Sequence, residues 1–176
     1  MTKSGLFSDF HTDRCTLLSY EGRAESVTVP EGIEVIGPGA FKACVSLKKI
    51  TLPQSLRAIM PEAFKGCRRL EDVRIPPRVS HIGAYAFHRC HSLTHISLPP
   101  SVEELGDCAF LYCDHLTSLH MPGVRRLGKQ AFVNDVLLKE LVISPELQED
   151  CLCDVFTSCS GLSSITFSGG ETYSFP

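Results

Sequence analysis

The sequence predicts an α/β solenoid, a superhelix of stacked coils with a parallel β-sheet on its concave side and short helical turns on its convex side. The first observation is that the motif A-F-x-x-C recurs every 23 residues, beginning at Ala40, Ala63, Ala86 and Ala109. The second is that a motif L-x-x-I-x-L-P recurs at the same interval. Repeats of about 20 to 50 residues are too small to bury an apolar face alone, so neighbouring copies must stack to complete one core.

The I-x-L part of the second motif is expected to form one strand per coil. Its apolar residues alternate with others, which is typical of a strand with one face against a core. The proline that follows has no N–H for a sheet hydrogen bond, so it is expected to end the strand. The expected strands form the parallel sheet and are centred on Val27, Ile50, Val73, Ile96, Leu119, Leu141 and Ile165.

The remainder of each repeat is expected to return the chain to the next strand. Apolar pairs such as Val79 with Ile82 direct the chain inward, and the glycine that follows suggests a tight turn with positive φ. In A-F-x-x-C the apolar residues are three and four apart, the spacing of a single helical turn. The glycines are Gly37, Gly83, Gly106 and Gly128. The phenylalanines are expected to stack in the core and not to bind a ligand: Phe41, Phe64, Phe87, Phe110, Phe132 and Phe156.

The repeats are expected to form one domain from residue 17 to residue 167. Residues 17–30 lack A-F-x-x-C and are interpreted as a capping segment before about six repeats, with tails at 1–16 and 168–176. The fifth copy, Ala131-Phe132, follows after 22 residues and carries Asp135 in place of the cysteine. The sixth copy, Val155-Phe156, follows after 24 residues. Terminal repeats often depart from the pattern because one of their faces has no stacking neighbour.

Composition and charge argue against several classes of function. With 17 Lys and Arg against 20 Asp and Glu, the formal net charge is −3, so the chain lacks the basic footprint of a nucleic-acid-binding protein. We therefore expect no nucleic-acid partner. Residues 1–14 contain four charged side chains and no long apolar run, so we expect neither a signal peptide nor membrane insertion. The expected location is cytoplasmic, with the cell surface or secretion as the alternative if an N-terminal signal is missing.

The nine cysteines are interpreted mainly as structural thiols. Five of them occupy the same place in successive repeats and are expected to form a column of small buried side chains. Cys151 and Cys153 lie outside this column and leave open the alternative of a thiol-based metal or redox sensor. The column residues are Cys44, Cys67, Cys90, Cys113 and Cys159.

Other residue patterns give little support to catalysis or to a bound metal. His88, His91 and His95 have helical spacing, but the repeat assigns two of them to a turn and one to a strand, so their ligand atoms would not converge. No Ser, His and Asp stand in the setting of a nucleophile elbow. We therefore expect a protein without enzymatic activity, cofactor or metal.

Strand alternation directs one set of mainly polar side chains away from the core, on the concave face of the sheet. We interpret this face as the binding site for a protein partner of unknown identity, since concave solenoid surfaces commonly serve this purpose. A homodimer through an open end of the solenoid is an alternative. The candidate binding residues are Lys49, Thr51, Asp72, Arg74, His95, Ser97, His120 and Glu140.

The consensus L-x-x-I-x-L-P-x-x-V-x-x-I-G-x-x-A-F-x-x-C resembles the BspA-like leucine-rich repeats of bacteria and some protists. The resemblance extends from about Leu17 to Phe167, nearly the whole chain. It implies a right-handed leucine-rich-repeat superhelix with a parallel concave sheet and a role in protein binding. In several relatives that role is played at the cell surface, so a BspA-like adhesin is the alternative function that the resemblance implies.

Overall fold

The computed structural model describes residues 9–147, 155 and 159–174. Within these ranges the chain forms short strands and no helix, so none of the described residues belongs to a helix that could cross a membrane. The strands, in chain order, are β1 (Phe10–Asp13), β2 (Thr16–Tyr20), β3 (Ser26–Thr28), β4 (Val35–Ile36), β5 (Lys49–Thr51), β6 (Ala58–Ile59), β7 (Asp72–Val73), β8 (His81–Ile82), β9 (His95–Ser97), β10 (Glu104–Leu105), β11 (Ser118–Met121), β12 (Arg126–Leu127), β13 (Glu140–Ile143), β14 (Ser164–Phe167) and β15 (Thr172–Ser174).

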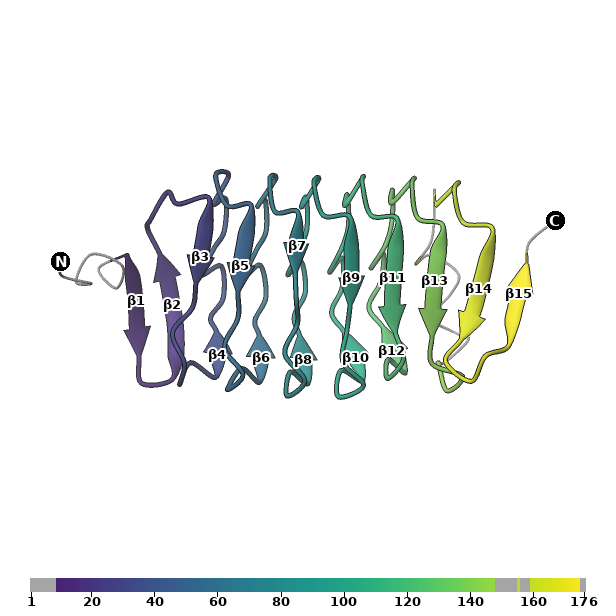
Figure 1. The fold of residues 1–176 in the computed structure, drawn as a ribbon, viewed down its shortest axis with the longest axis horizontal. Helices are drawn as coiled ribbons and strands as arrows, with labels where there is room; N and C mark the ends of the chain where they lie inside the picture. Colours follow the sequence, from purple (N-terminus) through teal and green to yellow (C-terminus); the bar gives the residue numbers. More distant parts are fainter. Residues whose placement is uncertain (1–8, 148–154, 156–158, 175–176) are drawn as a thin grey trace.

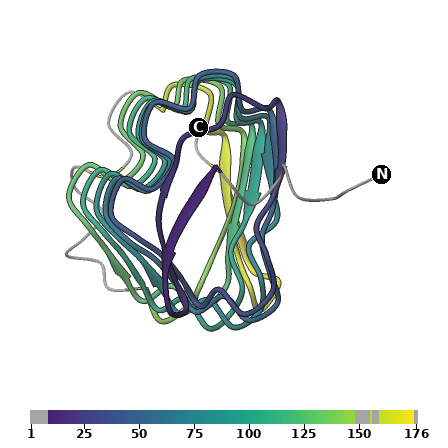
Figure 2. The same cartoon turned by 90° about the vertical axis from the view of Figure 1, so that its left-hand side faces the viewer.

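Successive coils stack into an elongated array along one axis (Figure 1). Viewed along that axis, equivalent segments of the repeats lie over one another (Figure 2). The parallel-strand solenoid of about six turns that the repeat period predicted is therefore confirmed.

The I-x-L segments form the expected parallel strands, from β3 to β14. Their register follows the repeat, with Ile50 opposite Val73 and Leu119 opposite Leu141. In β5 and β9 the central isoleucine is buried and both of its neighbours are exposed. The outer surface of β3, β5, β7, β9, β11, β13 and β14 is called the I-x-L face below.

A second parallel sheet, which the repeat pattern alone did not reveal, is formed by the V-x-x-I-G segments. β1 pairs antiparallel with β2 at one edge of this sheet, β2 lies parallel beside β4, and the V-x-x-I-G strands follow in the order β4-β6-β8-β10-β12. The inner residues of these two-residue strands, such as Ile59 and Ile82, are fully buried and join the same core cluster as Ile50 and Ile96. The core is therefore enclosed by strands from two separate parts of each repeat.

The A-F-x-x-C segments are turns, and the prediction of short helical turns is wrong for the described residues. Each of the five turns from Ala40 to Ala131 has two residues with positive φ, for example Tyr85 (58°) and Arg89 (59°), and positive φ interrupts a right-handed helix. Cys90 N–H donates to Phe87 C=O within the turn (3.1 Å), but Phe87 N–H donates to Ala109 C=O of the next coil (2.8 Å). Backbone groups are thus satisfied largely between coils instead of along a helix.

The prediction of positive φ at the glycines after V-x-x-I is also wrong, since Gly37, Gly83, Gly106 and Gly128 all lack it. At these positions the backbone of the preceding coil leaves no room for a Cβ. A Cβ on Gly106 would lie 2.3 Å from the backbone nitrogen of Ala84 on the preceding coil, and one on Gly128 would lie 2.3 Å from that of Asp107. Glycine is therefore needed because the backbones of neighbouring coils approach closely.

The phenylalanine column forms the centre of the core, as predicted for the members that the structure describes. Neighbouring rings stack with centroids 5.1–5.4 Å apart and planes within 9° of parallel. Offset aromatic pairs attract one another at such separations. The fully buried rings are Phe41, Phe64, Phe87, Phe110 and Phe132; Phe156 lies outside the described residues.

Antiparallel strands lie at both ends of the described array. β1 pairs with β2 at one end, and β15 pairs with β14 at the other. Tyr20 and Phe10 continue the aromatic column beyond Phe41, with successive centroid distances of 5.2 Å and 5.1 Å. The segments 1–16 and 168–176, which were expected to be tails, each contribute a strand.

Replacing Phe87, in the middle of the column, by alanine is expected to lower the free energy of unfolding by about 3 to 5 kcal/mol. The reason is that the substitution removes stacking against two rings and leaves a cavity. Urea denaturation followed by circular dichroism measures the effect. The control is Val45→Ala, since the Val45 side chain is 53% exposed; its effect is expected to stay within about 0.5 kcal/mol. An unchanged unfolding midpoint for Phe87→Ala would contradict the ring column.

The substitution Gly106→Ala is expected to lower the free energy of unfolding by about 1 to 3 kcal/mol, because the added Cβ forces two coils apart. Gly169→Ala is the matched control, since no heavy atom lies within 4 Å of its added Cβ. The control is expected to change stability by less than about 0.5 kcal/mol. Equal thermal denaturation curves for the two variants would show that the coils do not approach as described.

Candidate functional site

The predicted binding residues all lie exposed on the I-x-L face. The alternation of the strands produces this arrangement, because Ile50, Val73 and Ile96 turn inward and the residues beside them turn outward. β5 carries Lys49 and Thr51, and β7 carries Asp72 with Arg74 directly after it. The other candidates are His95 and Ser97 on β9, His120 on β11 and Glu140 on β13.

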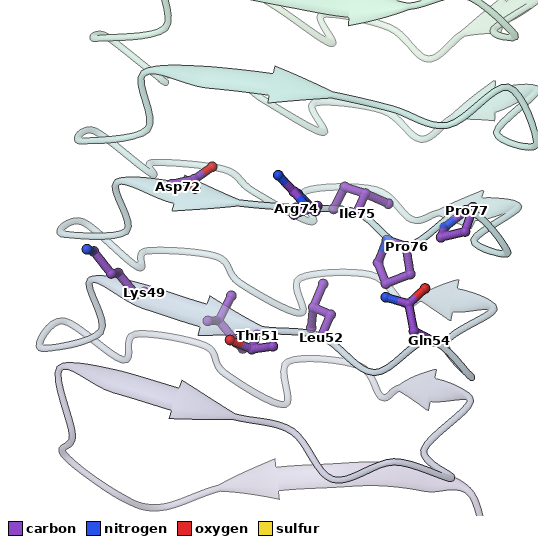
Figure 3. A pocket seen from close by; sticks show the side chains of 10 residues that line it. Lys49, Thr51, Leu52, Gln54, Asp72, Arg74, Ile75, Pro76 and Pro77 are labelled. Atoms are coloured by element: carbon purple, nitrogen blue, oxygen red, sulfur yellow. The ribbon is translucent and has the colours of Figure 1, made fainter.

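A groove of about 600 Å³ crosses the I-x-L face at β5 and β7 (Figure 3). Figure 3 shows Lys49 and Thr51 on one coil and Asp72 and Arg74 on the next. Beyond the strands, the lining continues along both coils to Leu52, Gln54, Ile75, Pro76 and Pro77.

A second groove, of about 440 Å³, adjoins the first because Arg74, Ile75 and Pro77 line both. The rest of its lining comes from the coils of β9 and β11: Ser97, Leu98, Pro99, Pro100, His120 and Pro122. Together the two form one depression that follows the strand ends from β5 to β11 and is called the proline groove below. Of the predicted binding residues, His95 and Glu140 are not among those that line it.

The prolines of this groove were expected only to end strands. Proline ends a sheet ladder because it has no N–H, and its fixed φ leaves a rigid apolar surface beside the last strand residue. The doubled prolines Pro76-Pro77 and Pro99-Pro100 stand at the same place in adjacent repeats. That repetition is the sequence signal that could have located the groove.

Charge is distributed unevenly along the groove. Lys49 and Asp72 are register partners on β5 and β7, so opposite charges lie on neighbouring strands there. Arg74 belongs to the other outward column, whose adjacent members Thr51 and Ser97 are uncharged. In the part of the chain that the structure describes, no carboxylate forms an ion pair with Arg74.

Two histidines of the face are held by hydroxyl groups on neighbouring coils. His95 Nδ1 lies 2.7 Å from Ser118 Oγ, and His120 Nδ1 lies 3.2 Å from Ser97 Oγ. These contacts orient exposed imidazole rings before any partner arrives. The face is therefore partly preorganised, which reduces the entropy lost on binding.

The strand ladder is interrupted beneath the groove. β7 pairs with β5 and β9 pairs with β11, but no strand pairing joins β7 to β9. Leu98 N–H donates to His120 C=O across the next pair of coils (2.8 Å), whereas the described bonds include no counterpart from Ile75 N–H to Ser97 C=O. The two halves of the I-x-L sheet therefore meet beside Arg74.

The cysteine column is part of the core. Cys67, Cys90 and Cys113 are fully buried, and each thiol donates to a phenylalanine carbonyl of the preceding coil, at 3.1–3.3 Å. Burial raises the pKa of all three thiols well above the ordinary value and raises the pKa of the partly buried Cys44 to about 11. Protonated thiols are poor nucleophiles and poor metal ligands. Cys151 and Cys153, which suggested a thiol sensor, lie outside the described residues.

Asp135 takes the place of the cysteine in the fifth copy and is fully buried. Its Oδ1 accepts a hydrogen bond from Cys113 N–H (2.9 Å), and its Oδ2 has no hydrogen-bond partner among the described residues. Burial raises the pKa of the carboxyl to about 9, because the ionised form would lose its hydration in the core. The Asp135 side chain is therefore protonated at neutral pH.

The three histidines with helical spacing lie in different surroundings. His88 is buried, and that burial lowers its pKa to about 4. His91 Nδ1 lies 2.6 Å from Asp114 Oδ2, whereas His95 lies on the I-x-L face. Within the described ranges, no three His, Cys, Asp or Glu side chains gather as metal ligands do.

The repeats identify the family. Residues 17–139 match six copies of the BspA type leucine rich repeat region. The chain therefore belongs to the BspA-type leucine-rich-repeat family, as the consensus motif suggested. A comparison with curated protein sequences finds no match.

Solved structures of bacterial leucine-rich-repeat proteins share the fold. The Treponema pallidum leucine-rich-repeat protein TpLRR is 24% identical with a TM-score of 0.69, over 82% of this chain and 90% of that one. A Eubacterium ventriosum leucine-rich-repeat protein is 21% identical with a TM-score of 0.74, over 91% of this chain and 46% of that one. The pneumococcal vaccine antigen PcpA is 22% identical with a TM-score of 0.72, over 90% of this chain and 40% of that one. This chain thus spans less than half of the latter two, and identities this low show the fold alone.

The buried Asp135 predicts an unusual dependence of stability on pH. Between about pH 4 and pH 9 the native state holds the Asp135 proton while the unfolded state releases it, so this carboxyl makes the free energy of unfolding fall as pH rises. The fall is at most about 1.4 kcal/mol per pH unit. Urea denaturation at pH 5, 6, 7 and 8 measures it. Asp135→Cys, which restores the column, is expected to remove this fall, and the exposed control Asp72→Asn is expected to leave it in place. A profile that Asp135→Cys does not alter would contradict the buried acid.

Proposed function

We propose that the protein is a non-enzymatic binding module that recognises another protein through its I-x-L face, with the proline groove at the centre of the contact. One observation carries this proposal. Six of the outward residues line a continuous groove that crosses four coils. A surface that combines apolar walls with a few placed polar groups is suited to recognition.

In each repeat, different residues form the core and the outer surface, and this separation supports the proposal. The phenylalanine, cysteine and inward strand residues are buried in the core, so they serve the stacking of the coils. The outward residues of the I-x-L strands differ from coil to coil, although the inward residues repeat. Side chains that the stacking does not require are free to serve recognition.

A binding role also fits the chemistry of the face better than catalysis does. His95 and His120 contact hydroxyl groups through Nδ1, but both rings lie on an exposed surface. General acid–base catalysis usually relies on groups set among buried or charged neighbours in a cleft, whereas these rings stand on the open face of the sheet. We therefore assign these side chains to hydrogen bonding with a partner.

The alternative of a thiol-based metal or redox sensor rests on Cys151 and Cys153, which lie outside the described residues. The proposal of a binding module does not depend on compartment. A cytoplasmic protein and a cell-surface adhesin would use the same face, and fractionation of the native cells distinguishes the two.

The triple variant Asp72→Ala, Arg74→Ala, His95→Ala is expected to lose the partner protein in affinity capture from native lysate, because three outward side chains of the face are removed. The matched control is Ser80→Ala, His81→Ala, Glu103→Ala, which truncates three exposed residues at the second sheet. Quantitative mass spectrometry compares the proteins that each bait retains. If wild type and both triple variants retain the same proteins, the I-x-L face is not the binding surface.

A further inference from the structure

We propose that the proline groove binds an extended, acidic segment of the partner protein, and that Arg74 binds one carboxylate of that segment. This inference rests on the proposed function and adds the chemistry of the partner to it.

The dimensions of the groove match an extended chain. It crosses the coils of β5, β7, β9 and β11, which at a spacing of about 4.8 Å corresponds to about 15 Å along the solenoid. An extended chain advances about 3.3 Å per residue, so about four or five residues fill the groove. Ile75 and Leu98 of the lining are buried, so the apolar surface open to such a segment comes mainly from the prolines.

The walls of the groove are rigid before binding. Pro77 and Pro100 are exposed, and Pro99 and Pro122 are partly exposed. Their rings fix the backbone and have few conformations to lose, so apolar side chains of a partner can pack on them at small entropic cost. Proline has no N–H, so these rings donate no hydrogen bond, and a charged group in the groove is recognised by the other lining residues.

Arg74 is the side chain placed for that role. It lies where the two grooves meet, since it lines both. The other cation of the lining, Lys49, has Asp72 as its register partner. Asp72 is also the single acid of the lining, so two cations stand against one acid there, and no described carboxylate forms an ion pair with Arg74. A guanidinium forms paired, charge-assisted hydrogen bonds with a carboxylate, so an acidic residue is the complementary group.

The second sheet shows the contrasting case in the same molecule. Arg57 Nε lies 3.5 Å from Glu34 Oε2, and Arg126 pairs with Glu104 on the adjacent coil. Each of these arginines is matched by an acid of the protein itself. The column of Arg74 supplies Thr51, Ser97 and His120 in the coils around it and no acid. The negative charge that complements Arg74 is therefore expected to come from the partner protein.

Selection from a display library of random peptides about twelve residues long, on the full chain, tests this assignment. We expect wild type to enrich peptides that carry Asp or Glu beside apolar residues. For synthesised winners, Arg74→Gln is expected to raise the Kd about tenfold or more in fluorescence polarisation, the loss expected for a hydrogen-bonded charge pair. Arg68→Gln, an exposed arginine on a turn away from the groove, is the matched control and is expected to leave the Kd unchanged.

Each outcome decides a specific point. Selected peptides without acidic residues would overturn the role of Arg74. Selected peptides that bind Arg74→Gln as tightly as wild type would overturn it as well. If such winners are still lost on Ser97→Trp, which fills the groove, the I-x-L face remains the binding surface and the proposed function stands. If no winner depends on Arg74 or on Ser97, or if no peptide is enriched, the extended acidic segment is rejected as occupant. The triple-variant capture then decides independently whether the face binds a protein at all.

Discussion

Hydrogen bonds between the backbones of successive coils determine the position of every other feature of this protein. Phe64 N–H donates to Ala86 C=O and Phe87 N–H donates to Ala109 C=O, each at 2.8 Å, so like residues of successive repeats are held at one height. The ring column and the thiol column follow from that register. The close approach that it imposes is also why glycine is needed at Gly106 and Gly128.

The same register separates residues that maintain the stack from residues that are free to recognise a partner. A side chain in an inward column must match its neighbours on both sides, and Asp135 shows the consequence of a mismatch: a buried carboxyl that keeps its proton. A side chain in an outward column has no such requirement. Variation there, as in Thr51, Arg74 and Ser97, changes the surface and leaves the core intact. Repeat proteins can therefore vary their binding chemistry at little cost to stability.

Sequence alone predicted the period, the I-x-L strands and the ring column, because each depends on apolar residues that recur at fixed positions. It was wrong about the A-F-x-x-C turns, since the spacing of Phe87 and Cys90 fits both a helical turn and a turn bonded to the next coil. The positive φ of Tyr85 and Arg89 distinguishes the two, and neither residue type indicates a positive φ.

The candidate site was predictable in part for a similar reason. Alternation on the strands correctly directed Asp72 and Arg74 outward, since outward direction is a local property. The groove depends on how the prolines of adjacent coils line up beyond the strands, and the interruption between β7 and β9 depends on packing between coils. Neither property can be inferred from one repeat considered by itself.

NMR scalar couplings across hydrogen bonds test the central claim most directly, because they identify the donor and the acceptor of each bond. The structure predicts a coupling from the Phe64 amide nitrogen to the Ala86 carbonyl carbon, 22 residues further along the chain. A coupling from Phe64 to the carbonyl of Met60, four residues earlier in the chain, would mean that the turn is helical and that the coils are not joined as described.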